Sequence, residues 1–260
     1  MKSLVWLILL LLPFSAISAP KSDLWAYWDK HVPESTQTIS HLAWQSFLDK
    51  YLITEGDNTL VRYAEVSTND KRALKNYIKT SAQLDPLTYS KAEQYAYWVN
   101  LYNAITIDLV LDDYPIKSIT KLGGLFSFGP WGDEVVKVNG KALTLNDIEH
   151  RILRPIWQDP RTHYAVNCAS LGCPNLQPKA FTADNTNDLL ESAAAEFINS
   201  DKGVSLKKGE LQLSSIYDWF IEDFGTQVQL LQHLNHYRES PIRDHEKVKY
   251  DYDWSLNLAQ

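Results

Sequence analysis

The sequence lacks the features that mark several domains or a membrane protein. After residue 18, no apolar run approaches the about 18 residues that a membrane span requires. No internal repeat and no low-complexity linker divides the chain. We therefore expect one domain over residues 19–260, without membrane insertion once the leading segment is removed.

Positive charge is also scarce. Lys and Arg number 25 against 32 Asp and Glu, which gives a formal net charge of −7. An acidic chain does not suit nucleic acid or anionic lipid, so we expect neither as a partner. The chain is rich in Trp and Tyr, and we expect most of these rings in the core rather than on a surface that binds glycans or peptides.

Cofactor and metal motifs are missing too. The glycines of "KLGGLFSFGPWG" (121–132) do not follow a strand into a helix, so they predict an ordered loop or lid and not a nucleotide site. Only two cysteines are present, Cys168 and Cys173. With His163 they lack the paired spacing of a zinc site. We therefore predict no cofactor and no metal.

Residues 1–18 are predicted to be a secretory signal peptide. Lys2 supplies the positive first region, and residues 4–14 form an apolar run too short for a transmembrane helix. Small residues at positions 16–18 suit cleavage after Ser18. No cysteine lies near this point, which argues against a lipoprotein. The expected location is the periplasm or the cell exterior.

Hydrophobic periodicity predicts more helix than strand. The strands fall mostly in hairpins rather than in strand–helix–strand units, and Asn139-Gly140 is a typical hairpin turn. This pattern predicts a helix-rich α+β domain with a small, mainly antiparallel sheet. The expected helices are 24–31, 39–52, 70–84, 90–112, 144–157, 185–199, 214–224 and 226–236; the expected strands are 59–66 and 162–166, with hairpins at 135–144 and 203–214.

The longest predicted helix, 90–112, is apolar around its whole circumference, so it should be buried in the middle of the domain. Glu93, Asn100 and Asn103 form a polar column on it. Buried polar groups need hydrogen-bond partners, so this column should face either loop backbone or a catalytic group.

The segment "PRTHYAVNCASLGCP" (160–174) contains both cysteines. Residues 162–166 have the β-branched and aromatic character of a buried strand, which would place Cys168 at the edge of a sheet. In an oxidising compartment Cys168 and Cys173 can form a disulfide, although so small a loop adds little stability. Three alternatives stay open: a structural disulfide, a free functional Cys168, or two thiols without a role.

A nucleophilic Cys168 would need a base and a group that orients the base. His163 lies five residues earlier, so in a regular strand it points to the opposite face. His150, from a separate helix, is the predicted base. Glu93 or Asn100 is its predicted orienting group.

Glu149 is expected to have a structural role. On the helical wheel it falls near the centre of an apolar stripe, where a carboxylate needs a partner. Arg151, Arg154 and Arg161 are the candidate partners. Glu149 is not predicted to orient His150, because consecutive helical side chains diverge.

Three segments in order resemble the domain-of-unknown-function family numbered 547: "YWVNLYNAITIDLVL", "LTLNDIEHRILRP" and "HYAVNCASLGCPNLQPKAFTA". The resemblance runs from about residue 70 to residue 224. The family occurs in exported bacterial proteins and in plant proteins with an added coiled coil. Its pattern includes Asn100, Asn103, Glu149, His150 and Cys168, with more variation at positions 163 and 173.

The resemblance implies a thiol at Cys168 rather than an obligatory disulfide. The Glu-His-Cys order also resembles papain-like and transglutaminase-like Cys-His enzymes, by analogy.

The leading hypothesis is an exported cysteine-dependent hydrolase or acyltransferase acting on an amide or peptide-like bond, in a peptide-like substrate or an envelope polymer. Cys168 would be the nucleophile and His150 the general base and acid, with backbone N–H groups of residues 168–170 holding the oxyanion. The rival hypothesis is a non-catalytic binding or adaptor module of the cell envelope with a Cys168–Cys173 disulfide. The sequence specifies no oligomeric state.

Overall fold

The computed structural model describes residues 19–124, 128–207, 210–242 and 248–259, so the predicted signal peptide lies outside the described residues. The helices are α1 (Leu42–Tyr51), α2 (Thr68–Ala82), α3 (Lys91–Asp113), α4 (Arg154–Trp157), α5 (Thr162–Ala165), α6 (Thr186–Asn199), α7 (Ile216–Trp219), α8 (Ile221–Phe224) and α9 (Gln227–Tyr237). Shorter turns are η1 (Tyr63–Glu65), η2 (Pro86–Thr88), η3 (Ile119–Lys121) and the π-helical η4 (Asp147–Leu153). The strands are β1 (Leu52–Glu55), β2 (Asn58–Val61), β3 (Val136–Val138), β4 (Lys141–Leu143), β5 (Val204–Lys207), β6 (Glu210–Ser214) and β7 (Val248–Asp251).

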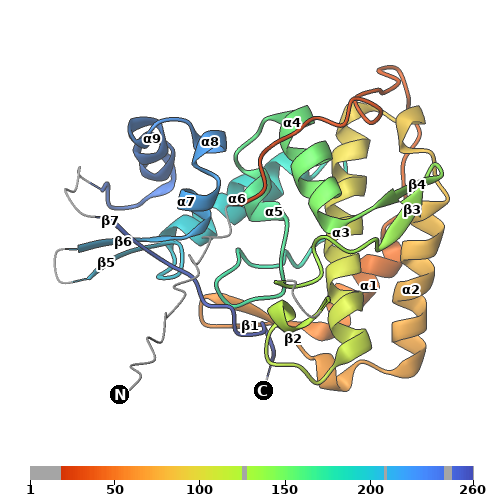
Figure 1. Ribbon diagram of the computed structural model, residues 1–260, viewed down its shortest axis with the longest axis horizontal. Helices are drawn as coiled ribbons and strands as arrows, with labels where there is room; N and C mark the ends of the chain where they lie inside the picture. Colours follow the sequence, from red (N-terminus) through yellow and green to blue (C-terminus); the bar gives the residue numbers. More distant parts are fainter. Residues whose placement is uncertain (1–18, 125–127, 208–209, 243–247, 260) are drawn as a thin grey trace, which may run out of the picture.

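Helix α3 is the predicted central helix, and its burial is confirmed. The Ser90 side chain caps its N-terminus by accepting a hydrogen bond from the Glu93 amide. Tyr97, Trp98 and Asn100, on different sides of the helix, have no exposed surface. Helix α3 packs against α2 on one side and against η4 on another (Figure 1).

Helices α1, α2 and α3 make up one side of the molecule, which we call the helical side (Figure 1). The antiparallel hairpin β3–β4 lies at its edge, with the predicted turn at Asn139 and Gly140. Both turn residues have positive φ, 46° and 72°, as a two-residue hairpin turn requires. A second hairpin pairs β1 with β2.

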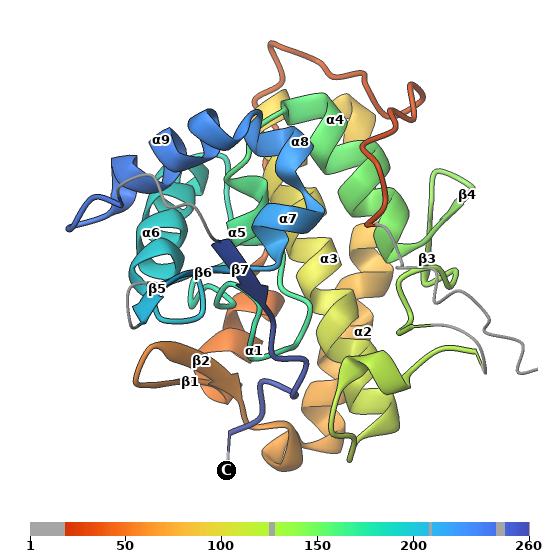
Figure 2. The ribbon, with the colours of Figure 1, turned by 60° about the vertical axis from the view of Figure 1, so that its left-hand side comes forward.

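The other side, the sheet side, contains α6 to α9 and a three-stranded sheet (Figures 1 and 2). Strands β5 and β6 pair antiparallel, as the predicted hairpin 203–214 requires. Strand β7, for which no strand was predicted, pairs in parallel with β6. Tyr164, Phe197 and Tyr217 belong to a separate hydrophobic core of this side. The fold is thus the expected helix-rich α+β domain with small, mainly antiparallel sheets.

Two predicted elements are wrong. Residues 162–166 do not form a strand; Thr162–Ala165 is the short helix α5. Short apolar runs do not distinguish helix from strand, and here tertiary contacts decide, because Thr162 and Tyr164 are both fully buried. Residues 24–31 are turn and irregular chain, although Trp28 is buried in the core. The predicted helix 144–157 is confirmed, because residues 145–157 are helical throughout; its middle, η4, has π-helical geometry.

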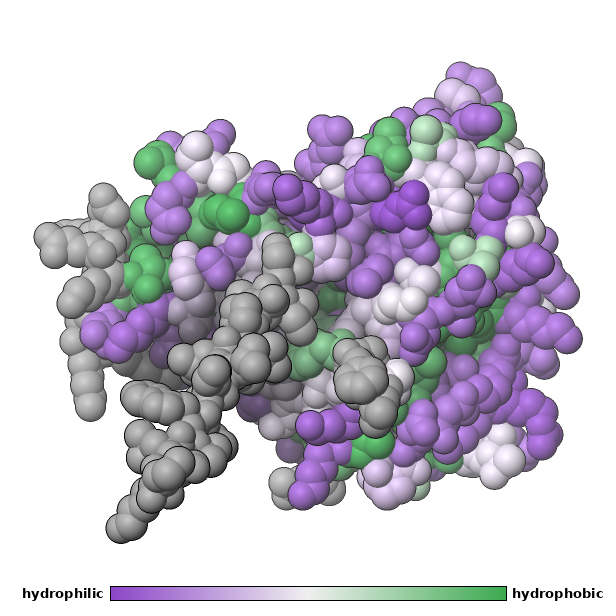
Figure 3. Space-filling model, viewed as in Figure 1, coloured by the Kyte–Doolittle hydropathy of each residue, from purple (hydrophilic) through white to green (hydrophobic). Residues whose placement is uncertain are grey.

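Hydrophilic residues cover most of the helical side on the face that Figure 3 shows. In the part of the chain that the structure describes, no helix is both long and apolar enough to cross a membrane.

Candidate active site

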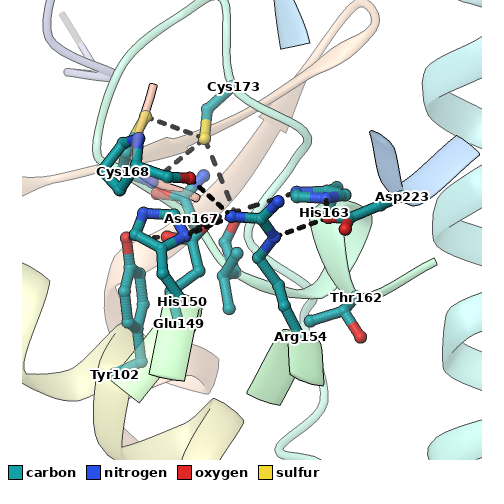
Figure 4. A network of polar contacts seen from close by, with 12 residues as sticks. Tyr102, Glu149, His150, Arg154, Thr162, His163, Asn167, Cys168, Cys173 and Asp223 are labelled. Atoms are coloured by element: carbon teal, nitrogen blue, oxygen red, sulfur yellow. Dashed lines mark hydrogen bonds and ion pairs between the residues drawn. The ribbon is translucent and has the colours of Figure 1, made fainter. Parts of the chain in front are cut away.

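A cavity of about 700 Å³ lies between the helical side and the sheet side. Its walls come from α3, η4, α5, the loop after α5, α7 and the segment that follows β7. Its lining includes Cys168, Cys173, Glu149, His150 and His163. Cys168 and His150, predicted from the sequence as nucleophile and base, therefore face the same space. Figure 4 shows the polar network around it.

The Cys168 sulfur has three hydrogen-bonding partners, and we call this group the thiol end of the cavity. The Sγ atom is 2.9 Å from Cys173 Sγ, 3.1 Å from Ser170 Oγ and 2.9 Å from the Tyr252 hydroxyl oxygen. Both cysteines are free thiols. Burial raises the pKa of the Cys168 thiol, but the hydrogen bonds from its three partners outweigh burial and hold the pKa below its usual value.

The pKa of Cys173 is shifted in the opposite direction to that of Cys168. Burial, together with the hydrogen bond to Cys168 and its charge, raises the pKa of the Cys173 thiol well above its usual value. The Cys173 sulfur also lies 3.0 Å from the Cys168 amide nitrogen. Cys168 is therefore the thiol that ionises first, and Cys173 donates to it once it is a thiolate.

Asn103 of α3 holds the backbone that leads to Cys168. Its side-chain nitrogen donates to the Ala165 carbonyl oxygen at 2.9 Å, and its oxygen accepts from the Asn167 amide at 2.8 Å. One buried side chain thus satisfies backbone groups on either side of Val166. This explains why a polar residue lies in an otherwise apolar helix.

The residue after Cys168 has a strained backbone. Ala169 has a φ of 56°, in the left-handed region that residues with a Cβ rarely adopt. The Asn167 side chain accepts from the Ala169 amide at 2.9 Å and donates to the Pro174 carbonyl oxygen at 2.8 Å, which closes the loop. Strain held in place by such bonds occurs frequently at functional sites, and here it fixes the turn that presents Cys168.

At the imidazole end, Glu149, His150 and His163 line the cavity, and Arg154 and Asp223 are hydrogen-bonded to the two histidines. Asp223 Oδ2 lies 2.6 Å from His163 Nε2 and 2.5 Å from Arg154 Nε. Burial raises the pKa of Asp223, but these two hydrogen bonds outweigh burial and lower the pKa to about 2. The carboxylate is therefore ionised and only accepts. His163 must donate its Nε2 proton to Asp223, which leaves Nδ1 to accept a proton.

His150 has the opposite tautomer. Its Nδ1 lies 2.9 Å from Arg154 Nη1, and because a guanidinium only donates, Nδ1 accepts. Burial lowers the pKa of His150 to about 4, so the ring is neutral at neutral pH and carries its proton on Nε2. This arrangement suits a hydrogen-bond donor better than the general base predicted from the sequence.

Glu149 is buried, as predicted, but it lies among the site residues. Its Oε1 is 3.8 Å from His150 Nδ1 and 3.9 Å from His163 Nδ1, and its Oε2 accepts from the Tyr102 hydroxyl at 2.9 Å. Within the described residues, none of the three predicted arginines pairs with it, so that part of the prediction is wrong. The π-helical geometry of η4 departs from the regular wheel on which Glu149 was separated from His150.

The structure does not bring Glu93 or Asn100 to His150. Glu93 Oε1 accepts from the Ile39 amide at 2.5 Å. Asn100 donates to the Phe181 carbonyl oxygen at 2.8 Å and accepts from the Phe181 amide at 3.0 Å. Both side chains bond to loop backbone, which was the alternative to a catalytic role. Their orienting role has no supporting contact among the described residues.

Two of the amides expected to hold an oxyanion are already occupied. The Cys168 amide donates to Cys173 Sγ, and the Ala169 amide donates to Asn167 Oδ1. Both amides therefore have hydrogen-bond partners within the tight turn around Cys168. His150 Nε2 is the ring nitrogen at the cavity that carries a proton for such a role.

Sequence reasoning missed three members of the site. His163 was set aside because a strand was expected, whereas in α5 it lines the cavity. Asp223 lies 60 residues after His163, and Tyr252 lies 84 residues after Cys168. No spacing rule links residues so far apart. The only signal was a carboxylate within the aromatic-rich predicted helix 214–224.

These features define a thiol–imidazole site in an α+β domain, and within the described ranges no group of three or more His, Cys, Asp or Glu is arranged to hold a metal ion. Residues 86–198 match the model of a family described as "Protein of unknown function, DUF547". The predicted resemblance to family 547 is thus confirmed for this segment, which includes Glu149, His150 and Cys168. No curated protein and no solved structure matches the chain, so the likeness to papain-like and transglutaminase-like enzymes stays an analogy.

Proposed function

We propose that the protein is a cysteine-dependent hydrolase or acyltransferase that attacks an amide or peptide-like carbonyl. The observation that carries the proposal is the Cys168 sulfur, which faces a cavity of about 700 Å³ and has three hydrogen-bond partners that lower its pKa. The thiolate is the nucleophilic form of cysteine. A cavity of this volume is in the usual range for small-molecule sites.

His163 is the better general base, with Asp223 as its orienting carboxylate. The Nε2–H···Oδ2 bond fixes the tautomer in which Nδ1 receives a proton, which is the arrangement that a catalytic dyad needs. His150, neutral and protonated on Nε2, is assigned as a donor to the developing oxyanion, in place of the occupied amides.

The proposed reaction passes through an acyl-enzyme. The Cys168 proton passes to His163 Nδ1 as the sulfur bonds to the carbonyl carbon. The C–N bond then breaks, and the imidazolium gives this proton to the leaving nitrogen. Water cleaves the thioester: His163 takes one proton from the water and returns it to the sulfur. An amine in place of water gives acyl transfer.

The test is to trap the acyl-enzyme. The reduced protein is incubated with N-acetyl-phenylalanine p-nitrophenyl ester, quenched in acid and digested with trypsin. Both cysteines fall in one tryptic peptide, residues 162–179, so fragment-ion masses must assign the acyl group. We expect acylation on Cys168 and none in Cys168→Ala. A protein that forms no adduct and releases nitrophenol no faster than Cys168→Ala contradicts the proposal.

One observation favours the rival function, a non-catalytic binding or adaptor module. The two sulfurs lie 2.9 Å apart, close enough to form a disulfide with little movement. The rival requires the purified, unreduced protein to carry this disulfide and to stay unreactive after mild reduction. Intact-mass measurement with and without reductant, followed by the acylation assay, separates the two functions.

We also propose that the protein acts outside the cytoplasm, in the periplasm or after secretion. The support is the charged, apolar and small-residue pattern of residues 1–18. Mass spectrometry of the protein recovered from a native extract should give an N-terminus at Ala19. An intact Met1 start in the exported fraction, or recovery only from the cytoplasm, contradicts export.

A further inference from the structure

Five aromatic residues form one continuous wall of the cavity. This aromatic wall consists of Phe128, Trp131, Trp219, Tyr252 and Trp254. Its members come from three distant parts of the chain. Trp254 is the centre of the wall, because its ring contacts the other four at centroid distances of 5.1, 5.7, 5.7 and 4.5 Å respectively.

The protein's own core does not fully cover the rings of the wall. Trp131, Trp219 and Trp254 are each partly exposed, although Trp is usually highly buried. Gly129 allows the rings to pack closely: it has a φ of 80°, and a Cβ there would lie 1.9 Å from the Trp131 ring. Several tryptophans that keep open surface on one cavity indicate a ligand that covers them.

The wall begins at the reacting atom. The Tyr252 hydroxyl is 2.9 Å from Cys168 Sγ, and the Tyr252 ring packs on Trp254. A group attached to the carbonyl that the sulfur attacks therefore meets an aromatic surface directly.

The wall carries no charge that would select a charged group. Among the described residues that line the cavity, the only acidic, basic or histidine side chains are Glu149, His150 and His163, all at the imidazole end. Phe220 stacks on His163 at a centroid distance of 4.4 Å and covers part of that end. A charged side chain placed against the wall would lose its hydration without gaining a partner.

We infer that the cavity selects an acyl donor with an aromatic side chain next to the carbonyl that Cys168 attacks. This inference rests on the proposed function, because it assigns the specificity of the same site. An aromatic side chain stacks favourably on an aromatic surface, and burial of its apolar area adds to the binding free energy.

The experiment compares two alkylating probes, 2-iodoacetamide and N-benzyl-2-iodoacetamide. In each, the Cys168 sulfur displaces iodide and forms one S–C bond, so the probes differ only in the benzyl group. Rate constants at Cys168 are measured on the reduced native protein and on the urea-unfolded protein. The preference is the rate constant of the benzyl probe divided by that of 2-iodoacetamide. We expect this ratio to be on the order of tenfold higher in the native protein than in the unfolded chain.

Trp254→Ala should remove most of this preference, which is measured as the ratio of the two rate constants at Cys168. Trp157→Ala is the matched control, because Trp157 is partly exposed but packs on Tyr95 outside the cavity. It should keep the full preference. Trp219→Ala serves as a second wall variant if circular dichroism shows that Trp254→Ala is unfolded.

The outcomes separate the inference from the proposed function. A reactive Cys168 with equal preference in native and unfolded protein overturns the inference and leaves the function standing. Full preference in both wall variants also overturns it. A native Cys168 that reacts with neither probe after reduction overturns the proposed function itself.

Discussion

The two ends of the cavity handle charge in opposite ways. At the thiol end, the hydrogen-bond partners of Cys168 are all uncharged side chains: Cys173, Ser170 and Tyr252. At the imidazole end, the buried guanidinium of Arg154 is matched by the Asp223 carboxylate. The thiol end therefore has no charged partner for Cys168, whereas the imidazole end contains a buried ion pair.

The largest expected effect comes from breaking the imidazole end. Asp223→Ala leaves the Arg154 guanidinium, whose side chain is only 2% exposed, without its counter-ion. Removing one partner of a buried ion pair typically costs about 3 to 5 kcal/mol of unfolding free energy. Urea denaturation should show this loss, with Asp184→Ala, an exposed carboxylate, as the control that changes stability by less than about 0.5 kcal/mol. Equal stability of both variants would mean that Asp223 is not the counter-ion.

The second effect is the pH dependence of stability. The pKa of His150 is about 4 in the folded protein because of burial, below the ordinary value of 6.5. Between these values the unfolded chain binds a proton that the folded protein does not, so stability falls as pH decreases from about 6.5 to 4. The contribution is roughly 3 kcal/mol over this range.

The measurement is the unfolding free energy at several pH values. His41 and His233 also have a folded pKa of about 4 and contribute in the same direction, so the difference between wild type and His150→Gln is the quantity to compare. The wild type should lose more stability than the variant on acidification. His31→Gln, at an exposed position, should match the wild type. Parallel curves for all three proteins would contradict a neutral, buried His150.

The smallest expected effect comes from removing one hydrogen-bond donor at the thiol end. Tyr252→Phe removes one hydrogen bond to the Cys168 sulfur, so the pKa of the thiol should rise. A hydrogen bond to a charged group is worth about 1.5 kcal/mol, so alkylation of Cys168 at neutral pH should slow on the order of tenfold. Stability should change little. Tyr250→Phe, two residues earlier on β7, is the matched control, and a rate equal to that control would exclude the Tyr252 hydroxyl as a donor.

Much of the fold was predictable because local patterns determine it. The all-round apolar character of α3, the Asn139-Gly140 turn and the pattern of the hairpin 203–214 each reflect contacts within a short stretch of chain. The strand predicted at 162–166 failed because the same residues, Thr162 and Tyr164, suit a buried helix as well as a buried strand. That one error also set His163 aside.

The site was only partly predictable for a related reason. Cys168, His150 and Glu149 lie within the segment that matches the family, residues 86–198. Asp223, Tyr252 and Trp254 lie outside it. Tyr252 and Trp254 reach the cavity because β7 pairs with β6, and Asp223 reaches His163 from α8. Tertiary structure, not sequence spacing, decides which carboxylate meets His163.

The parallel pairing of β7 with β6 has a consequence for how the protein is made. Tyr252 and Trp254 follow β7, and they emerge from the ribosome long after Cys168 does. Pairing between segments distant in sequence forms late in folding, because chain closure must come first. Until β7 is in place, the Cys168 sulfur has neither the Tyr252 hydroxyl nor the Trp254 ring beside it. The hydrogen bond from Tyr252 that helps to lower the pKa of Cys168 therefore depends on the pairing of the last strand.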